Sequence, residues 1–259
     1  MSKSQILSLL LLPLFISCVS TRSATYLYGL KDSTVFEEVA VPAHVIQASD
    51  ILNITVSSQN PEAARIFNNP SRTETRSTTA AGLQLELGGY LVNKEGLIHF
   101  LILGDLKVAG LTTDQLQARI RQDILRRKLL VDPTVDVRLM NYKVTVLGEV
   151  SRPTVVSVPN EKITLLEALG LAGDITLYGQ RNNVLIIREV GGKRESHRVD
   201  LNSNDLLKSP YYYLQSNDVV YVAPNKARVT SVSRFNQYLP AIVSSLTVLV
   251  IVVDRIIRR

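Results

Sequence analysis

Apolar and polar residues alternate along two neighbouring stretches of the chain, and the phase of the alternation changes between them. The apolar positions are odd from Val135 to Leu139 and even from Tyr142 to Val146. Because successive residues of a strand point to opposite faces of a sheet, a change of phase marks a bulge, a bend or the passage into another domain. The pattern therefore predicts a structural break between Met140 and Tyr142.

The part of the chain before this break predicts short strands around a polar excursion. Val45–Val56 alternates in part and indicates a strand with a turn, whereas the polar stretch Ser57–Gly82 indicates a loop with a short helix at Pro61–Phe67. Short apolar runs then predict hairpin-like strands, at Leu83–Leu87, Tyr90–Val92 and Leu97–Leu103.

The clearest helix of this part is predicted over Thr112–Leu130. Thr112 and Gln115 fit a capping box, in which each side chain bonds the backbone N–H of the other residue. Apolar residues recur every four positions and form a stripe suited to burial: Leu116, Ile120 and Ile124. Asp132-Pro133 is expected to end the helix.

After the break, several short strands surround one predicted helix. The helix Thr164–Ala172 has a capping-box candidate in Thr164 and Glu167, and Gly173 suits the position after its C-cap. Strands are expected at Lys143–Leu147, Thr154–Val158, Asn183–Glu189, Ser196–Val199, Tyr211–Leu214 and Asp218–Val222. Short strands around one helix predict an α+β fold.

The most apolar stretch of the sequence is Leu239–Val253, in which Ser244, Ser245 and Thr247 are the polar interruptions. A helix over Tyr238–Ile257 would be ~30 Å long, which is about the thickness of the hydrocarbon core of a bilayer. We therefore expect a C-terminal transmembrane α-helix.

This expected helix has two different sides when each residue is placed 100° further round its axis. The apolar side, expected to face lipid, carries Leu239, Ile242, Leu246, Leu249, Val250 and Val253. The other side, expected to face a pore or neighbouring helices, carries Gln237, Ser244, Thr247, Asp254 and Arg258. A plain membrane anchor needs no polar side, so the asymmetry favours a stave of a helical barrel. Val248 and Ile251 interrupt the polar side, and the plain anchor stays open as the alternative.

The N-terminus has the features of a bacterial lipoprotein signal peptide. Lys3 precedes an apolar run at Ile6–Ile16, and Ser17 stands directly before the single cysteine, Cys18. This is a loose match to a lipobox and predicts cleavage after residue 17, with lipid attachment at Cys18. The alternative is an ordinary signal peptide with an incidental cysteine. Residues 18–41 are polar and are expected to tether the lipid to the first domain.

Composition and charge exclude several classes of function. The net charge is +6, but the positive residues are scattered and form no basic stripe with interleaved aromatic residues, so nucleic-acid binding is disfavoured. A single cysteine provides neither a disulfide nor a thiolate metal cluster. His44, His99 and His197 stand alone in the sequence and are expected to be structural or surface residues.

No catalytic residue, cofactor site or metal site is predicted, because the sequence contains no phosphate-binding loop, nucleophile elbow or dinucleotide-binding turn. Asp105, Asp114 and Glu149 could face a polymer, but solvated or helix-capping roles are favoured. Tyr211-Tyr212-Tyr213 could stack on sugar rings, but packing within the domain or against a neighbouring subunit is favoured.

Several segments resemble a known family. Three of them resemble the polysaccharide export domain of Wza-type outer-membrane export lipoproteins: Ile98–Thr112, Asp132–Val137 and Val144–Pro153. The stretch Leu147–Pro224 resembles the soluble-ligand-binding β-grasp (SLBB) domain, most recognisably at Leu165–Gly173 and Asn217–Val222. The chain departs from the family at Pro153-Thr154, where Pro-Gly is usual, and at Gly173-Asp174, where paired glycines are common. Better-known members carry two SLBB domains, whereas one is found here.

The resemblance implies a domain order: signal peptide 1–17, tether 18–41, polysaccharide export domain 42–142, SLBB domain 143–224, and a membrane helix with a basic tail over 225–259. It implies a ring of about eight identical subunits whose helices form a barrel across the outer membrane. Capsular polysaccharide or exopolysaccharide would pass from the periplasm to the cell surface, where the C-terminus would emerge. Expected partners are other copies of the chain, an inner-membrane polysaccharide co-polymerase, the polysaccharide and outer-membrane lipid.

The polar loop Ser57–Thr79 is expected near the periplasmic entrance of this ring. The resemblance implies a transport component without enzymatic activity. The alternative is a periplasmic glycan-binding or scaffold lipoprotein with a simple C-terminal membrane anchor. A hydrolase or lyase is disfavoured, because no paired-carboxylate motif is visible.

Overall fold

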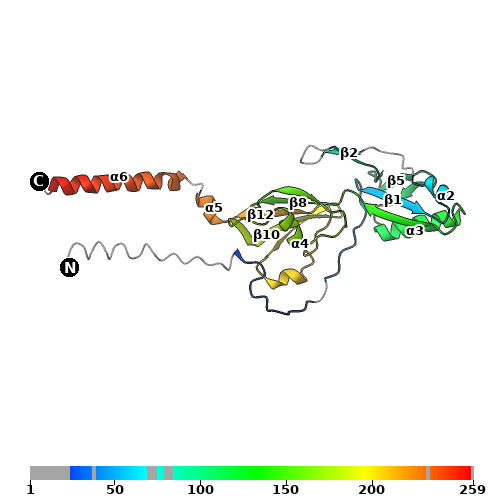
Figure 1. The fold of residues 1–259 in the computed structure, drawn as a ribbon, viewed down its shortest axis with the longest axis horizontal. Helices are drawn as coiled ribbons and strands as arrows, with labels where there is room; N and C mark the ends of the chain where they lie inside the picture. The colour runs from blue at the N-terminus through cyan, green and yellow to red at the C-terminus, as the bar shows by residue number, and fades with distance from the viewer. Residues whose placement is uncertain (1–23, 37–38, 69–74, 79–83, 232–233, 258–259) are drawn as a thin grey trace.

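The computed structural model describes residues 24–36, 39–68, 75–78, 84–231 and 234–257. Figure 1 shows two folded units in a row, with helix α6 (Arg234–Ile257) projecting from the end of the second unit.

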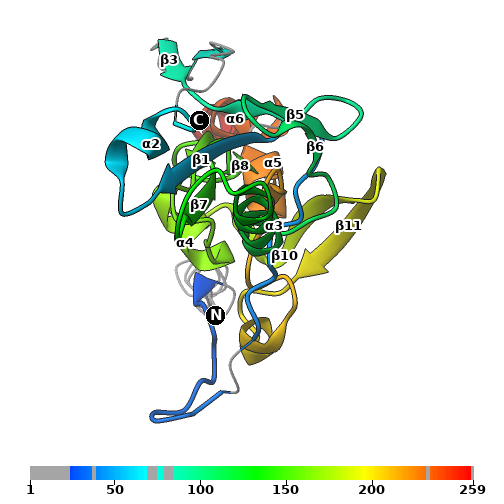
Figure 2. The same cartoon turned by 90° about the vertical axis from the view of Figure 1, so that its right-hand side faces the viewer.

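The first unit is built on a small antiparallel sheet with the strand order β4-β1-β7. The central strand β1 (Ile51–Ser57) pairs with β4 (Tyr90–Leu91) and with β7 (Thr134–Leu139). Helix α3 (Thr113–Arg126) packs against β7, and Figure 2 looks down this helix beside the sheet. The predicted stripe of α3 is fully buried, which confirms the sequence pattern: Leu116, Ile120 and Ile124.

Thr112 and Gln115 form the predicted capping box at the start of α3. The helix ends at Arg126, however, and not at Leu130. Lys128 takes a left-handed backbone conformation with φ of 54°, which breaks the helical repeat four residues before Asp132.

Short elements complete the first unit: α2 (Pro61–Arg65), β2 (Thr75–Thr78), β3 (Gln84–Leu87), β5 (Leu97–Phe100) and β6 (Gly104–Lys107). β2 pairs with β3, and β5 pairs with β6. The expected strand Leu97–Leu103 is therefore too long, because the chain turns after Phe100 and returns as β6. The polar excursion expected as a loop with one short helix also contains strand β2.

The second unit contains a five-stranded sheet in the order β11-β10-β12-β8-β9. Its strands are β8 (Lys143–Gly148), β9 (Thr154–Ser157), β10 (Gly179–Val190), β11 (Lys193–Val199) and β12 (Val219–Pro224). β12 and β8 are parallel, whereas the other pairs are antiparallel. The chain therefore leaves one sheet with β7 and enters the other with β8, where the apolar pattern changes phase.

Helix α4 (Leu165–Leu171) starts at the predicted capping box of Thr164 and Glu167. Gly173, with φ of 78°, follows the C-cap as predicted. The strand expected at Tyr211–Leu214 is not formed. The 3₁₀ helix η3 (Asn204–Lys208) is followed there by turns, and Tyr213 makes only an isolated bridge to Thr164.

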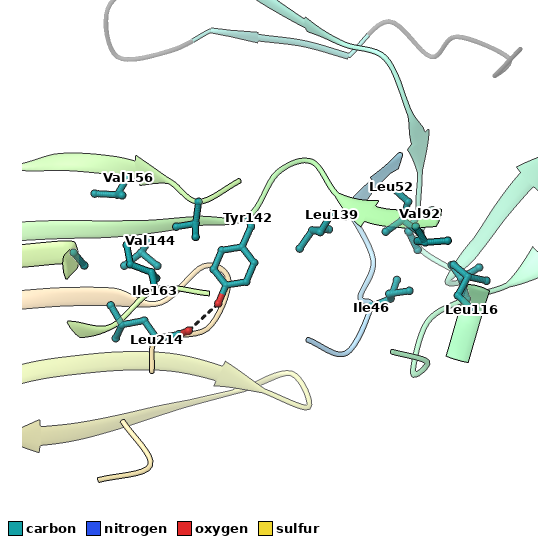
Figure 3. Packing of buried hydrophobic residues seen from close by; sticks show 14 of the residues in the cluster. Ile46, Leu52, Val92, Leu116, Leu139, Tyr142, Val144, Val156, Ile163 and Leu214 are labelled. Atoms are coloured by element: carbon teal, nitrogen blue, oxygen red, sulfur yellow. Dashed lines mark hydrogen bonds between the residues drawn. The ribbon is translucent and has the colours of Figure 1, made fainter. Parts of the chain in front are cut away.

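Buried apolar side chains continue from the first unit into the second (Figure 3). Tyr142 lies between the units and donates a hydrogen bond to the carbonyl of Leu214 over 2.7 Å. Burial, together with the nearby Asp218 carboxylate, raises the pKa of Tyr142 to about 12.

After β12, the short helix α5 (Lys226–Ser231) leads to α6, so the C-terminal segment is helical as predicted. Pro240 lies inside α6, and charged residues occur towards its end at Asp254 and Arg255. Within the described residues, none of the helices combines the length and the apolar character that a bilayer crossing requires. The expected transmembrane helix is therefore not supported by the structure.

Candidate assembly surfaces

The three histidines of the chain have local partners. His44 Nε2 lies 2.8 Å from Asp50 Oδ2, in a partly buried pair, and His99 Nδ1 lies 2.8 Å from Asp105 Oδ1 at the surface. His197 stacks on the ring of Tyr211, with 4.1 Å between ring centroids. Across the described part of the chain, no group of three or more His, Cys, Asp or Glu residues gathers for a metal ion.

The carboxylates considered for polymer contact have ordinary structural surroundings. Asp105 bonds His99, and Asp114 lies exposed in the first turn of α3. Glu149 accepts hydrogen bonds from the Thr176 hydroxyl at 2.9 Å and from Arg228 Nε at 3.2 Å.

The tyrosines at 211–213 pack within the second unit. The guanidinium of Arg188 lies 5.0 Å from the ring centroid of Tyr211, whose ring also stacks with His197. The rings of Tyr212 and Tyr213 meet edge to face at 5.1 Å. These contacts agree with the packing interpretation.

Sequence patterns did not reveal a buried ion pair beneath these rings. Asp218 is fully buried and accepts hydrogen bonds from Arg188 Nη2 and from the Gln215 amide, both at 2.7 Å. Arg188 also donates to the carbonyl of Tyr213. The pair therefore holds residues 213–218 against β10, although the strand expected at Tyr211–Leu214 is not formed.

The two faces of the five-stranded sheet differ in what covers them. One face is fully buried under α4 and the neighbouring loops, as the burial of Val144, Val146, Ile186 and Val220 shows. Six apolar residues of the opposite face remain partly exposed: Leu147, Val155, Leu185, Ile187, Val219 and Tyr221. We call these six residues the outer face.

The register of the strands places these residues in two neighbouring rows, in which Thr145 separates Val155 from Val219. Tyr221 pairs with Leu147 on β8 and with Leu185 on β10, and Val219 pairs with Ile187. Leu147 is 42% exposed, Val155 49% and Tyr221 38%. A solvated face of an antiparallel sheet usually carries polar residues, so an apolar outer face indicates a covering partner.

A sequence signal for this surface did exist. Val144–Leu147, Val184–Ile187 and Val219–Val222 are nearly continuous apolar runs, whereas a strand with one wet face alternates. Continuous runs are typical of strands covered on both faces.

The side chains of helix α6 that the structure describes are also exposed. Its apolar side chains are exposed around the helix, including Ile242, Leu246 and Leu249 from the expected lipid side and Val248 and Ile251 from the other side. Ser244 and Thr247 are exposed too, and their hydroxyls donate to carbonyls one turn earlier in the same helix. Other predicted residues lie outside the described residues or side chains: Cys18, Gln237, Leu239, Val250, Val253, Asp254 and Arg258.

A cavity of about 610 Å³ lies where the two units meet. Side chains and backbone of the first unit line it at His44 and Gln47, and those of the second unit line it at Glu189, Gln215 and Ser216. No tyrosine or phenylalanine ring contributes to its lining, so it offers no stacking platform for a sugar.

Comparisons with known proteins agree with this two-unit architecture. A family described as "Polysaccharide biosynthesis/export protein" matches residues 38–140, and the "SLBB domain" family matches residues 142–222. The chain is also similar to proteins named "EPS I polysaccharide export outer membrane protein EpsA". It is 35% identical over 153 residues to the one from Ralstonia nicotianae (strain ATCC BAA-1114 / GMI1000) and 32% identical over 142 residues to the one from Ralstonia solanacearum.

These alignments cover 58% and 53% of this chain, but only 39% and 37% of the two relatives. The chain therefore matches well under half of the length of either relative. The two domain matches follow each other directly and meet where the chain passes from β7 into β8. The chain therefore carries a polysaccharide biosynthesis/export domain followed by an SLBB domain, and by this pair of domains it resembles the Wza-type polysaccharide export proteins.

Proposed function

We propose that this protein is a subunit of an outer-membrane assembly that exports capsular polysaccharide or exopolysaccharide from the periplasm to the cell surface. Its role is that of a passive conduit without enzymatic activity. Support comes from the export domain followed by an SLBB domain and from relatives named as polysaccharide export outer membrane proteins.

The outer face carries the structural argument for an assembly. A contiguous apolar surface across β8, β10 and β12 is costly to leave in water, and a second copy of the chain can cover it. Contacts between different surfaces of identical subunits close into a ring when the rotation between them fits. A ring of about eight copies is the arrangement that family resemblance suggests.

Helix α6 fits the same assembly. We propose that it packs against α6 of neighbouring copies, with the side of Gln237, Ser244, Thr247, Asp254 and Arg258 turned towards a shared passage. The side of Leu239, Ile242, Leu246, Leu249, Val250 and Val253 is then turned outward. The chain is proposed to be lipidated at Cys18, held at the outer membrane and in contact with an inner-membrane polysaccharide co-polymerase.

The assembly is tested by extracting the protein from outer membranes in mild detergent and imaging single particles. Ring-shaped particles are expected. A uniform population of monomers would contradict the proposal and favour a periplasmic glycan-binding or scaffold lipoprotein. In cells, deletion of the gene is expected to abolish surface polysaccharide, and undiminished export would exclude a conduit role.

A further inference from the structure

The segment that precedes the export domain is docked on the SLBB domain. The amide of Leu27 donates to the carbonyl of Leu201 over 2.9 Å, and Tyr26 and Leu27 pack against the apolar core. Figure 1 shows this blue segment passing along the second unit before the chain returns to β1. Residues early in the sequence are therefore held at the SLBB domain.

Tyr26 makes two specific contacts with the second unit. Its hydroxyl donates to the carboxylate of Asp174, and its ring lies 5.3 Å from the guanidinium carbon of Arg181. Arg181 is only 5% exposed, and its terminal nitrogens donate to the carbonyls of Ile175 and Thr176. The ring of Tyr26 thus covers a buried cation that also binds the 174–178 loop.

The same loop holds the base of the C-terminal helices. The amide of Asn225 donates to the carbonyl of Tyr178 over 2.6 Å, and its side chain donates to the carbonyl of Leu177. Arg228 of α5 lies 5.5 Å from the ring centroid of Tyr178 and bonds Glu149, which in turn bonds Thr176. Both ends of the folded body therefore converge on one loop.

We call the 174–178 loop together with α5 the pole. Its outward side chains suit a lipid surface: Leu177 is 80% exposed, Val229 63% and Tyr178 42%, while Lys226 is an exposed cation. A leucine left this exposed gains from entering an apolar layer, and tyrosine and lysine are typical of the headgroup region.

The length of the N-terminal segment limits how far the pole can lie from a lipid anchor. Tyr26 comes eight positions after Cys18, and a fully extended chain over those eight steps spans at most about 28 Å. A lipid on Cys18 therefore keeps the Tyr26 site close to the membrane surface, on the side where α5 and α6 leave the body.

We propose that the pole contacts the membrane surface, with Leu177 entering the apolar layer beneath the headgroups and Tyr26 holding the pole to the lipid-modified end of the chain. This inference rests on the proposed function, because the anchor is the proposed lipid on Cys18.

A depth-sensitive label tests the contact directly. The lipidated full chain, carrying Leu177→Cys labelled with an environment-sensitive fluorophore, is reconstituted into vesicles of phosphatidylethanolamine and phosphatidylglycerol. Emission is expected to shift to shorter wavelength and to be quenched by a lipid-linked quencher. The matched control is Val131→Cys, whose position is 83% exposed and follows α3 in the first unit. Quenching at position 177 no stronger than at 131 would overturn the proposal.

The role of Tyr26 is tested in the same vesicles. Tyr26→Ala is expected to reduce quenching at position 177, while Val35→Ala, at a 94% exposed position of the same segment, leaves it unchanged. If quenching at position 177 is unchanged in Tyr26→Ala, Tyr26 does not hold the pole to the lipid-modified end of the chain. If the protein shows quenching at position 177 but forms no rings, the export assembly alone is refuted. If it forms rings but shows no quenching at position 177, the pole contact alone is refuted.

Discussion

Substitution of Leu147 by glutamate is predicted to prevent assembly while leaving the monomer folded. Leu147 belongs to the outer face, where it lies on β8 and pairs with Tyr221 of β12. Its neighbours Val146 and Val144 point the other way, into the core, where they are fully buried. The substitution therefore changes a surface for association and removes nothing from the core of the subunit.

The exposed fraction of Leu147 sets the size of the effect. Full burial of a leucine is worth about 1.5–3 kcal/mol, and 42% of this side chain is still exposed in the subunit, so about 0.6–1.3 kcal/mol remains to be gained at each contact. Leu147→Ser should therefore weaken each contact about three- to ninefold. Leu147→Glu must also bury a carboxylate, which costs several kcal/mol more and should weaken the contact by more than about 100-fold.

Mass photometry of the detergent-extracted protein measures the outcome. Wild type is expected as an oligomer and Leu147→Glu as a monomer with an unchanged circular dichroism spectrum and melting temperature. Leu125→Glu is the matched control, because Leu125 is 43% exposed but lies on α3 of the first unit. Oligomers of normal size from a folded Leu147→Glu variant would refute the assignment of the outer face as a subunit contact.

Three further predictions concern the stability of the subunit, measured by denaturant unfolding. Asp218→Asn leaves the guanidinium of Arg188 buried without its counter-ion and should lower the free energy of unfolding by about 3–5 kcal/mol. The double variant with Asp218→Leu and Arg188→Met should recover most of that loss. An equal loss of stability in the two variants would contradict this reasoning. Gly148→Ala should cost about 2–4 kcal/mol, because φ is +94° and a Cβ would lie 2.0 Å from the carbonyl oxygen of Val222; a smaller effect would mean that β8 and β12 can separate cheaply. Burial raises the pKa of Tyr142 to about 12, so the contribution of this shift to the free energy of unfolding is complete below pH 10. About 3 kcal/mol of the free energy of unfolding should be lost as the pH rises through 12. The Tyr142→Phe variant should lack this part of the loss of stability at alkaline pH.

Features set by local sequence were predictable. Both capping boxes form as expected, at Thr112 and at Thr164, because each needs only residues three positions apart. The change of apolar phase between Met140 and Tyr142 coincides with the passage from one sheet to the other, since side-chain alternation reports directly which face is buried. The end of α3 was not predictable, because the left-handed conformation of Lys128 has no sequence signal comparable to glycine.

Features set by contacts between distant residues were missed. Tyr211–Leu214 has the composition of a strand, but its backbone makes only an isolated bridge to Thr164, and Arg188 from β10 and the stacking of Tyr211 on His197 hold it in addition. Likewise, Tyr26 carries no pattern that predicts its contact with Asp174, which lies far along the chain. Apolar periodicity describes which residues seek burial but not which partner buries them.

The outer face and the pole occupy different parts of the SLBB domain, and this separates the two proposals experimentally. The outer face lies on β8, β9, β10 and β12, whereas the pole is formed by the 174–178 loop and α5. A monomeric Leu147→Glu protein should therefore still show quenching of a label at Leu177, because a lipid anchor and the Tyr26 contact act within one chain. Loss of quenching on dissociation would instead show that the pole reaches the membrane only when the subunits are held together, so that membrane contact is a property of the ring.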